Sequence, residues 1–137
     1  VINGDNAITA PFVNAGTTKA FSYQGKDAEV KLEGDIITRR GVPVLDKKDI
    51  LLPGEHNVEN YMAAIAAVDG LVPDKVVREV AGNFKGVEHR IELVRELDGV
   101  RYYNDSIGTS PTRTMACLDS FDQKIIPSHA LFTPHSK

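Results

Sequence analysis

Residues 86–114, GVEHRIELVRELDGVRYYNDSIGTSPTRT, contain the clearest folding signals in the chain and most of the polar groups that could bind a ligand. Asp98 and Gly99 stand between two runs rich in Val, Ile, Leu and Tyr. An Asp-Gly pair in that setting is a strong signal for a two-residue hairpin turn. The pattern therefore predicts strands at residues 90–97 and 100–104.

The second predicted strand ends in three polar residues, Asn104, Asp105 and Ser106. Open α/β sheets place their ligand sites at the carboxyl ends of strands. Ser110 is a good N-cap and a proline follows it, so we expect a helix over residues 112–121. The positive end of that helix would lie beside Asp105 and Thr109, which favours a pocket for an anion.

The composition is typical of a folded, soluble protein. The chain has 137 residues, 42% of them hydrophobic, which is enough for one core or for parts of two domains. Net charge is -3 and the basic residues are dispersed, so we expect neither a nucleic-acid nor a membrane partner. Cys117 is the single cysteine, and no apolar run reaches membrane-spanning length, which fits a reducing compartment. Because the sequence opens without Met or a signal-peptide pattern, we interpret its start as lying within a domain.

Short β-type runs separated by glycine-containing turns dominate the first third of the chain. We expect strands at residues 20–23, 29–32 and 36–39, arranged as antiparallel hairpins at a sheet edge, the end of a strand at residues 1–3, and another strand at residues 50–52. Between the first two, residues 7–15 are predicted to form a short helix that Pro11 interrupts and Gly16 closes.

Two amphipathic helices are predicted next. The first covers residues 58–69 and ends at Gly70, with a buried face formed by Val58, Tyr61, Met62, Ile65, Ala66 and Val72. The second starts at Pro73 and carries an apolar stripe of Val76, Val77, Val80, Ala81 and Phe84. We expect the two helices to form a packed pair.

A change of domain is predicted near Gly86. Residues 85–88 form a plausible linker, after which the hairpin begins a new sheet that the following helix covers. A strand at residues 123–126 would complete a strand-helix-strand unit. Residues 127–137, PSHALFTPHSK, contain two prolines and no Asp or Glu, so we expect a loose tail.

Three segments in this order resemble the Mur ligases: PGEHNVENYMAAIAAV (53–68), FKGVEHRIELV (84–94) and GVRYYNDSIGTSPTRT (99–114). The similarity covers about residues 1–126 and is greatest to the members that add D-glutamate. It implies an α/β fold, with residues 1–86 as the end of a P-loop-type ATP-binding central domain built from short antiparallel strands and a helix pair. Residues 87–126 would begin a Rossmann-like C-terminal domain, and 127–137 lie outside the resemblance.

The resemblance also implies an activity. Enzymes of this branch use ATP and Mg²⁺ to join D-glutamate to UDP-N-acetylmuramoyl-L-alanine through an acyl phosphate. The product is a precursor of peptidoglycan, on which cell shape and cell division depend. The parent protein would be a cytoplasmic ligase and a monomer. Because this sequence has neither the phosphate-binding loop nor the magnesium-positioning residues of the family, we expect no catalytic residue and no metal ligand in it, and the chain alone should be inactive.

The same resemblance assigns six residues to the binding site. The nucleotide-binding residues are Asn57, Asn60, Arg90 and Asp105, and the substrate-binding residues are Thr109 and Ser106. The two asparagines would bind adenine, because an amide side chain offers both a donor and an acceptor. Arg90 would grip phosphate oxygens or stack on a ring. Asp105 would accept hydrogen bonds from ribose hydroxyls, and Thr109 would lie near the incoming D-glutamate.

Each assignment has a structural alternative. Asn57 directly precedes a predicted helix and could serve as its N-cap. Arg90 on a strand is ordinarily solvated or in a surface ion pair. Asp105 fits a turn, and Thr109 fits a cap on the loop side.

Two positions depart from the family pattern. Ile107 and Gly108 stand where the family commonly has lysine and alanine, so the phosphate contact of that lysine is missing. Either another cation supplies it, or the site relies on backbone donors and on Arg90.

Two other functions stay open at this point. A related amide ligase such as folylpolyglutamate synthase shares the architecture, and a stand-alone nucleotide-binding module would bind ATP without any chemistry. Metal binding by His129 and His135 has little support, because their spacing is not that of a helical site and no Cys, Asp or Glu is near.

Overall fold

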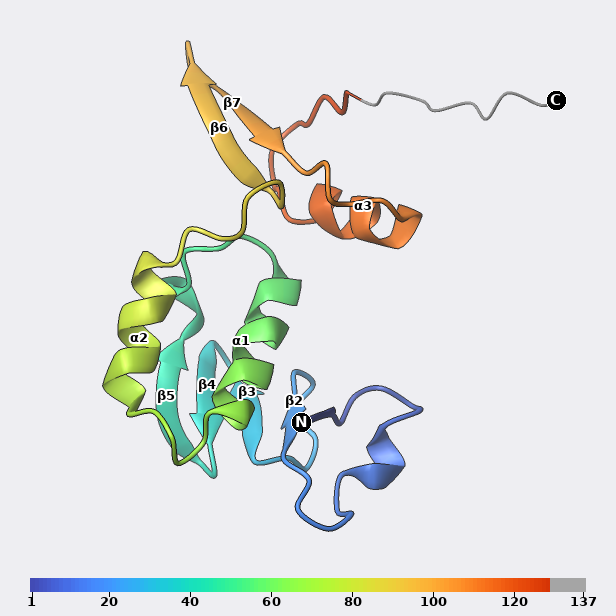
Figure 1. The fold of residues 1–137 in the computed structure, drawn as a ribbon, viewed down its shortest axis with the longest axis vertical. Helices are drawn as coiled ribbons and strands as arrows, with labels where there is room; N and C mark the ends of the chain where they lie inside the picture. Colours follow the sequence, from blue (N-terminus) through green and yellow to red (C-terminus); the bar gives the residue numbers. More distant parts are fainter. Residues whose placement is uncertain (129–137) are drawn as a thin grey trace, which may run out of the picture.

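The computed structural model describes residues 1–128. The first part of the chain forms a five-stranded mixed sheet covered by two helices, and the second part forms a hairpin with one helix (Figure 1). The elements, in chain order, are β1 (Ile2–Asn3), η1 (Ala10–Phe12), β2 (Ala20–Ser22), β3 (Val30–Glu33), β4 (Ile36–Arg39), β5 (Val42–Asp46), η2 (Lys47–Asp49), α1 (Glu55–Ala67), α2 (Asp74–Asn83), β6 (Glu92–Leu97), β7 (Val100–Asn104) and α3 (Pro111–Leu118). The fold is α/β, as expected.

The sheet has the order β1-β2-β3-β4-β5, and only its second half is antiparallel. The expected hairpin at β3 and β4 is confirmed, but β2 and β3 pair in parallel, so the expectation of antiparallel pairing was wrong there. Long-range contacts explain the difference. The Asp5 carboxylate accepts from the Tyr23 backbone N–H at 2.7 Å, beyond the end of β2, and the Glu29 carboxylate accepts from the Ala20 N–H at 2.7 Å, at its start. Both acidic residues lie outside the paired strands, so the pattern of the strands themselves does not reveal these bonds.

Two other predicted elements in this part were wrong, and one strand was not predicted. Residues 7–15 form only the short η1 turn, and residues 50–52 form no strand because the Leu51 N–H donates to the Ala81 carbonyl at the end of α2. Strand β5 was not predicted, because it contains Pro43, a residue that usually argues against a strand. Proline is tolerated there because β5 is the last strand of the sheet, and a register shift in β4 lies beside Pro43.

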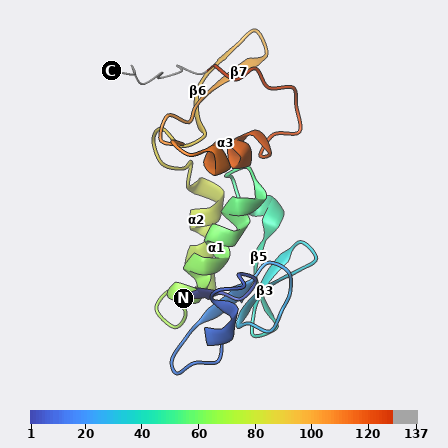
Figure 2. The ribbon, with the colours of Figure 1, turned by 90° about the vertical axis from the view of Figure 1, so that its right-hand side faces the viewer.

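The main core lies between the sheet and the helices. Its fully buried large side chains come from both layers: Val30, Ile37, Val44, Leu45, Met62 and Ile65. Figures 1 and 2 show α1 and α2 side by side on one face of the sheet. The predicted buried face of α1 is confirmed. In α2 only Val77 and Ala81 are buried, so the predicted stripe was too wide.

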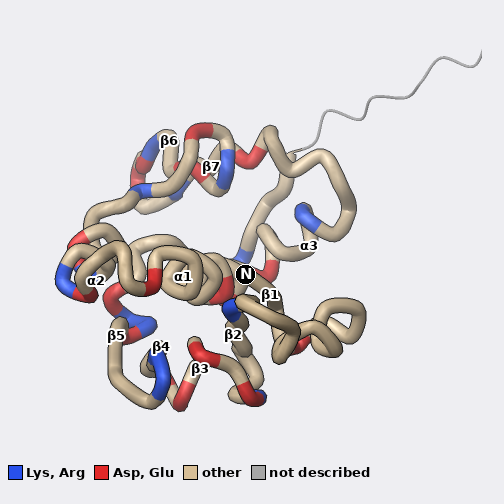
Figure 3. The backbone as a smooth tube through the Cα atoms, turned by 60° about the horizontal axis from the view of Figure 1, so that its bottom comes forward, with Lys and Arg blue, Asp and Glu red and all other residues tan. Residues whose placement is uncertain are grey.

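Positive and negative residues are interspersed over both parts of the structure (Figure 3). They pair locally, and Asp69 is an example. Its carboxylate lies 3.3 Å from the Arg39 Nε and 2.6 Å from an Arg40 Nη atom, which ties the turn after α1 to strand β4. Of the two arginines only Arg40 is exposed, and an ion pair with an exposed side chain contributes about 0–1 kcal/mol.

The predicted hairpin is confirmed as β6 and β7. Asp98 and Gly99 both have positive φ, 50° and 79°, the conformation that an Asp-Gly hairpin turn requires. The Ser110 cap of α3 is also confirmed, since its Oγ accepts from the Arg113 N–H at 3.4 Å.

The end of α3 differs from the prediction. The helix stops at Leu118, and residues 123–126 form no strand. A strand needs a neighbour for its backbone groups, and within residues 1–128 the second sheet consists of β6 and β7 alone. Most of the predicted tail, including His129 and His135, lies outside the described residues. Within residues 1–128, no helix has the length and apolar character needed to cross a membrane.

Candidate functional site

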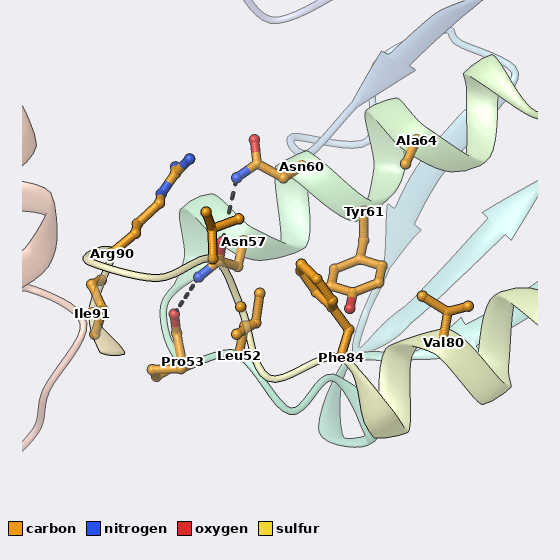
Figure 4. A pocket seen from close by; sticks show the side chains of 12 residues that line it. Leu52, Pro53, Asn57, Asn60, Tyr61, Ala64, Val80, Phe84, Arg90 and Ile91 are labelled. Atoms are coloured by element: carbon orange, nitrogen blue, oxygen red, sulfur yellow. Dashed lines mark hydrogen bonds between the residues drawn. The ribbon is translucent and has the colours of Figure 1, made fainter. Parts of the chain in front are cut away.

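A pocket of about 400 Å³ lies where the start of α1 and the end of α2 meet the linker at residues 84–91 (Figure 4). It is mainly apolar and has a few polar groups. Its lining residues are Leu52, Pro53, Asn57, Asn60, Tyr61, Ala64, Val80, Phe84, Gly86, Val87, Arg90 and Ile91. Pockets of 300–1,000 Å³ with this character are typical of small-molecule sites.

The two asparagines lie on one side of this pocket. Asn57 is buried, and its Nδ2 donates to the Pro53 carbonyl at 2.7 Å. Its Oδ1 accepts from Asn60 Nδ2 at 3.3 Å. The helix begins at Glu55 with Gly54 as N-cap, so the N-cap alternative for Asn57 was wrong. Asn57 is thus committed to local bonds, while among the described residues the Asn60 carbonyl oxygen accepts none and can take a donor from a ligand.

Arg90 lines the same pocket from the linker, and Figure 4 shows its side chain extending on the side of Asn60. Its neighbours His89 and Ile91 both have positive φ, 65° and 47°. A left-handed conformation is unusual for a β-branched residue and is a form of local strain. The Asp105 carboxylate accepts from the Ile91 N–H at 3.2 Å, which helps to hold this conformation. The placement of Arg90 therefore depends on Asp105.

A second pocket, of about 150 Å³, lies on the other side of Arg90. It shares three wall residues with the first and adds residues of α1, the loop after β7, and α3. Its lining residues are His56, Val87, Arg90, Ile91, Asp105, Ile107, Gly108, Arg113, Ala116 and Cys117. Asn60 and Asp105 thus face neighbouring pockets that the linker separates.

The Asp105 carboxylate has further contacts in the second pocket. Burial raises the pKa of the Cys117 thiol to about 11, and the hydrogen bond from that thiol to Asp105 contributes. A Cβ atom on Gly108 would lie 2.7 Å from the Asp105 Oδ2. The Asp105 carboxylate therefore occupies space that a side chain at position 108 would fill.

His56 lies in this pocket without a positive charge at neutral pH. Burial lowers its pKa, and the nearby Arg90 guanidinium lowers it further, against a smaller opposite effect of Asp105.

In the first pocket, the Tyr61 hydroxyl is buried and has no hydrogen-bond partner within the described residues. Burial also raises the pKa of Tyr61.

Thr109 and Ser106 line neither pocket. Both are exposed, and their backbone N–H groups bond within the loop, to the Ile107 carbonyl at 3.0 Å and to Asn104 Oδ1 at 3.1 Å. The structure therefore groups four of the six predicted site residues around the linker and leaves these two apart. Sequence reasoning missed Phe84 and Arg113 as lining residues, because each depends on how a helix is oriented.

A magnesium site does not fit the described residues. Among residues 1–128, no three His, Cys, Asp or Glu side chains are grouped as metal ligands. The histidine pair considered above lies outside this part of the chain. The residues around the linker instead suit an organic ligand with a flat apolar portion and hydrogen-bonding groups.

Comparison with known proteins identifies relatives along most of the chain. No family model matches it. It is 46% identical over 129 residues to the UDP-N-acetylmuramoylalanine--D-glutamate ligase of Clostridium beijerinckii, covering 92% of this chain and 28% of the relative. The ligase of that name from Acetivibrio thermocellus is also 46% identical, over 133 residues, with the same coverage. That from Clostridium botulinum is 43% identical and covers 98% of this chain and 31% of the relative.

These relatives confirm the resemblance to the Mur ligases and to their D-glutamate-adding members. They carry the name of that branch, which favours it over the folylpolyglutamate synthase alternative. The chain spans less than a third of the length of these curated relatives.

Proposed function

We propose that this chain, related in sequence to a segment of the D-glutamate-adding Mur ligases, forms one side of the ATP site of such an enzyme. The whole protein would use ATP to join D-glutamate to UDP-N-acetylmuramoyl-L-alanine in peptidoglycan precursor synthesis. The chain alone would bind nucleotide weakly and would not turn over. Residues 1–86 would belong to the P-loop-type central domain and residues 87–126 to the Rossmann-like domain.

One observation carries the site proposal: Asn57, Asn60 and Arg90 line a single apolar pocket large enough for a nucleobase. Adenine has a flat apolar ring with donors and acceptors on its edge. The free Asn60 carbonyl oxygen can accept from its amino group, and the Arg90 guanidinium can stack on the ring. The apolar walls Phe84 and Val80 would cover the rest of the ring.

The second pocket supports the placement of the ribose. Asp105 faces that pocket across the Arg90 wall, and a carboxylate can accept hydrogen bonds from sugar hydroxyls. It already accepts from the Ile91 N–H and the Cys117 thiol, and two carboxylate oxygens have lone pairs enough to accept from a ribose hydroxyl as well. Thr109 and Ser106, exposed on the following loop, would face D-glutamate in the whole enzyme.

The described residues offer no place for the magnesium ion that ATP chemistry requires. Its ligands and the phosphate-binding loop would have to come from outside residues 1–128. When bound, the metal would supply charge stabilisation during phosphoryl transfer. We therefore assign to this chain binding and orientation of the nucleoside and no chemical step.

A chimera tests the proposed activity. The matched segment of the Clostridium beijerinckii ligase would be replaced by residues 1–126, and ADP release would be measured with UDP-N-acetylmuramoyl-L-alanine and D-glutamate. We expect turnover that requires both substrates and falls at least about tenfold with Arg90→Ala, because a charged hydrogen bond contributes about 1.5–3 kcal/mol. A folded chimera that turned over only with a folate and L-glutamate would overturn the proposal.

A titration of the isolated chain tests the site. Adenosine added to the ¹⁵N-labelled protein should shift the amide signals of Asn57, Asn60 and Arg90. Asn60→Ala should weaken binding about three- to tenfold, the value of one hydrogen bond. Asn83→Ala is the matched control, because Asn83 is an exposed residue at the end of α2 that lines neither pocket. Shifts confined to other residues would refute the site.

A further inference from the structure

Two arginines from different elements line the second pocket. Arg90 comes from the linker and Arg113 from the first turn of α3. Among the described residues, neither guanidinium forms an ion pair, although acidic side chains are common in the chain. Arginines on a protein surface are well suited to binding carboxylates and phosphates in two-pronged geometry.

The charge of this pocket is positive at neutral pH. Two guanidinium groups face one carboxylate, Asp105, and His56 is neutral, so one positive charge is in excess. The Asp105 charge is also partly compensated by the Ile91 N–H and the Cys117 thiol. The large apolar residues of the wall, Val87, Ile91 and Ile107, contribute no charge. The pocket therefore favours an anion over a neutral ligand.

The two pockets share the wall formed by Val87, Arg90 and Ile91. A ligand lying across this wall would place its flat portion in the larger pocket and its other end near Arg113. We propose that Arg113 binds a phosphate group of the nucleotide whose base occupies the larger pocket. This inference rests on the proposed function and adds a phosphate-binding residue from α3 to it.

The alternative is that Arg113 is only a solvated residue on an exposed helix turn. The two possibilities differ in one measurable way. A phosphate-binding arginine contributes to the binding of ADP and not to that of adenosine, whereas a solvated arginine contributes to neither. Comparing the two ligands therefore isolates the role of Arg113 from that of the base site.

The test measures dissociation constants of adenosine, AMP and ADP for the 137-residue chain by NMR titration without metal. We expect the native chain to bind ADP more tightly than adenosine. Arg113→Ala should weaken ADP binding about tenfold and leave adenosine binding within about twofold, because only the charged hydrogen bond is lost. Arg113→Lys should retain part of the ADP affinity, since lysine keeps the positive charge but lacks the paired N–H donors of the planar guanidinium.

Arg95→Ala is the matched control. It removes the same charge from an exposed residue of β6 that lines neither pocket. If Arg95→Ala and Arg113→Ala weakened ADP binding equally, the effect would be one of net charge alone, and the inference would be overturned. Equal affinity for adenosine and ADP, in the native chain and in Arg113→Ala, would overturn it while leaving the base site intact. Absence of binding for all three ligands would overturn the proposed function as well.

Discussion

Gly54, at the start of α1, packs against Ser120, which lies just after the end of α3. Replacing Gly54 with alanine tests this contact. Its φ is 97°, a conformation that other residues rarely adopt. An added Cβ atom would lie 2.5 Å from Ser120 Oγ and 2.8 Å from His56 Cε1. Holding alanine at this positive φ costs about 1–3 kcal/mol, and the close contacts of its Cβ atom cost about another 1–3 kcal/mol. Gly54→Ala should therefore lose about 2–6 kcal/mol of folding free energy.

Two measurements check this expectation. Urea unfolding followed by circular dichroism should show a midpoint lowered by about 1–3 M, given a slope of about 2 kcal/mol per M. The reaction of Cys117 with a disulfide reagent should become faster, because the clash pushes α3 away from α1. This cysteine is the single one in the chain, so the reaction reports on α3 alone.

Gly82→Ala is the matched control for this glycine substitution. Gly82 is inside α2 and no atom would lie within 4 Å of an added Cβ. The same chemical change should therefore raise stability by about 0.5–1 kcal/mol. In Gly54→Ala/Ser120→Ala, removal of the hydroxyl should recover about 1 kcal/mol of the loss. An unchanged urea midpoint and unchanged thiol reactivity in Gly54→Ala would refute the described contact between α1 and α3.

Three further outcomes are expected. Tyr61→Phe should keep or slightly raise the unfolding temperature, because the buried hydroxyl has no partner within residues 1–128, and a clear loss of stability would contradict this. Because burial and Asp105 raise the pKa of Cys117 to about 11, alkylation of the folded chain should accelerate as pH rises through about 11 rather than about 9. The same shift means that Cys117 favours folding at lower pH and that this contribution is lost as pH rises from about 9 to about 11. Gly108→Ala should displace the Asp105 carboxylate, which lies 2.7 Å from the added Cβ, and should move the alkylation profile of Cys117 to lower pH, whereas an unchanged profile would contradict it.

The sequence predicted best the elements whose signals are local. The β6–β7 hairpin followed from Asp98 and Gly99, which supply two positive φ angles in adjacent positions. The Ser110 cap followed from a side chain and a backbone N–H three residues apart. Where a distant residue decided the outcome, prediction failed. The end of β2 bonds to Asp5 through the Tyr23 N–H, and the Leu51 N–H bonds to α2 where a strand was predicted.

The same distinction applies to the candidate site. Asn57 and Asn60 were predicted to act together, and their spacing within one helix turn brings them into contact. The N-cap alternative failed because Gly54, with its positive φ, starts the helix earlier than an asparagine signal indicated. Phe84 and Arg113 could not be identified as pocket residues from the sequence, because the exits and orientations of α2 and α3 decide which side chains face the linker.

Asp105 links the two pockets physically, which changes how its role should be understood. Its carboxylate contacts the linker through the Ile91 N–H, contacts α3 through the Cys117 thiol, and lies against Gly108. Since Ile91 adjoins Arg90, a shift of this carboxylate changes the wall that both pockets share. The position of Arg90 and the charge of the second pocket are therefore coupled through one side chain. Loss of nucleotide binding on replacing Asp105 would therefore not by itself distinguish a lost contact to ribose from a displaced Arg90, because adenosine and ADP share both the base and the ribose.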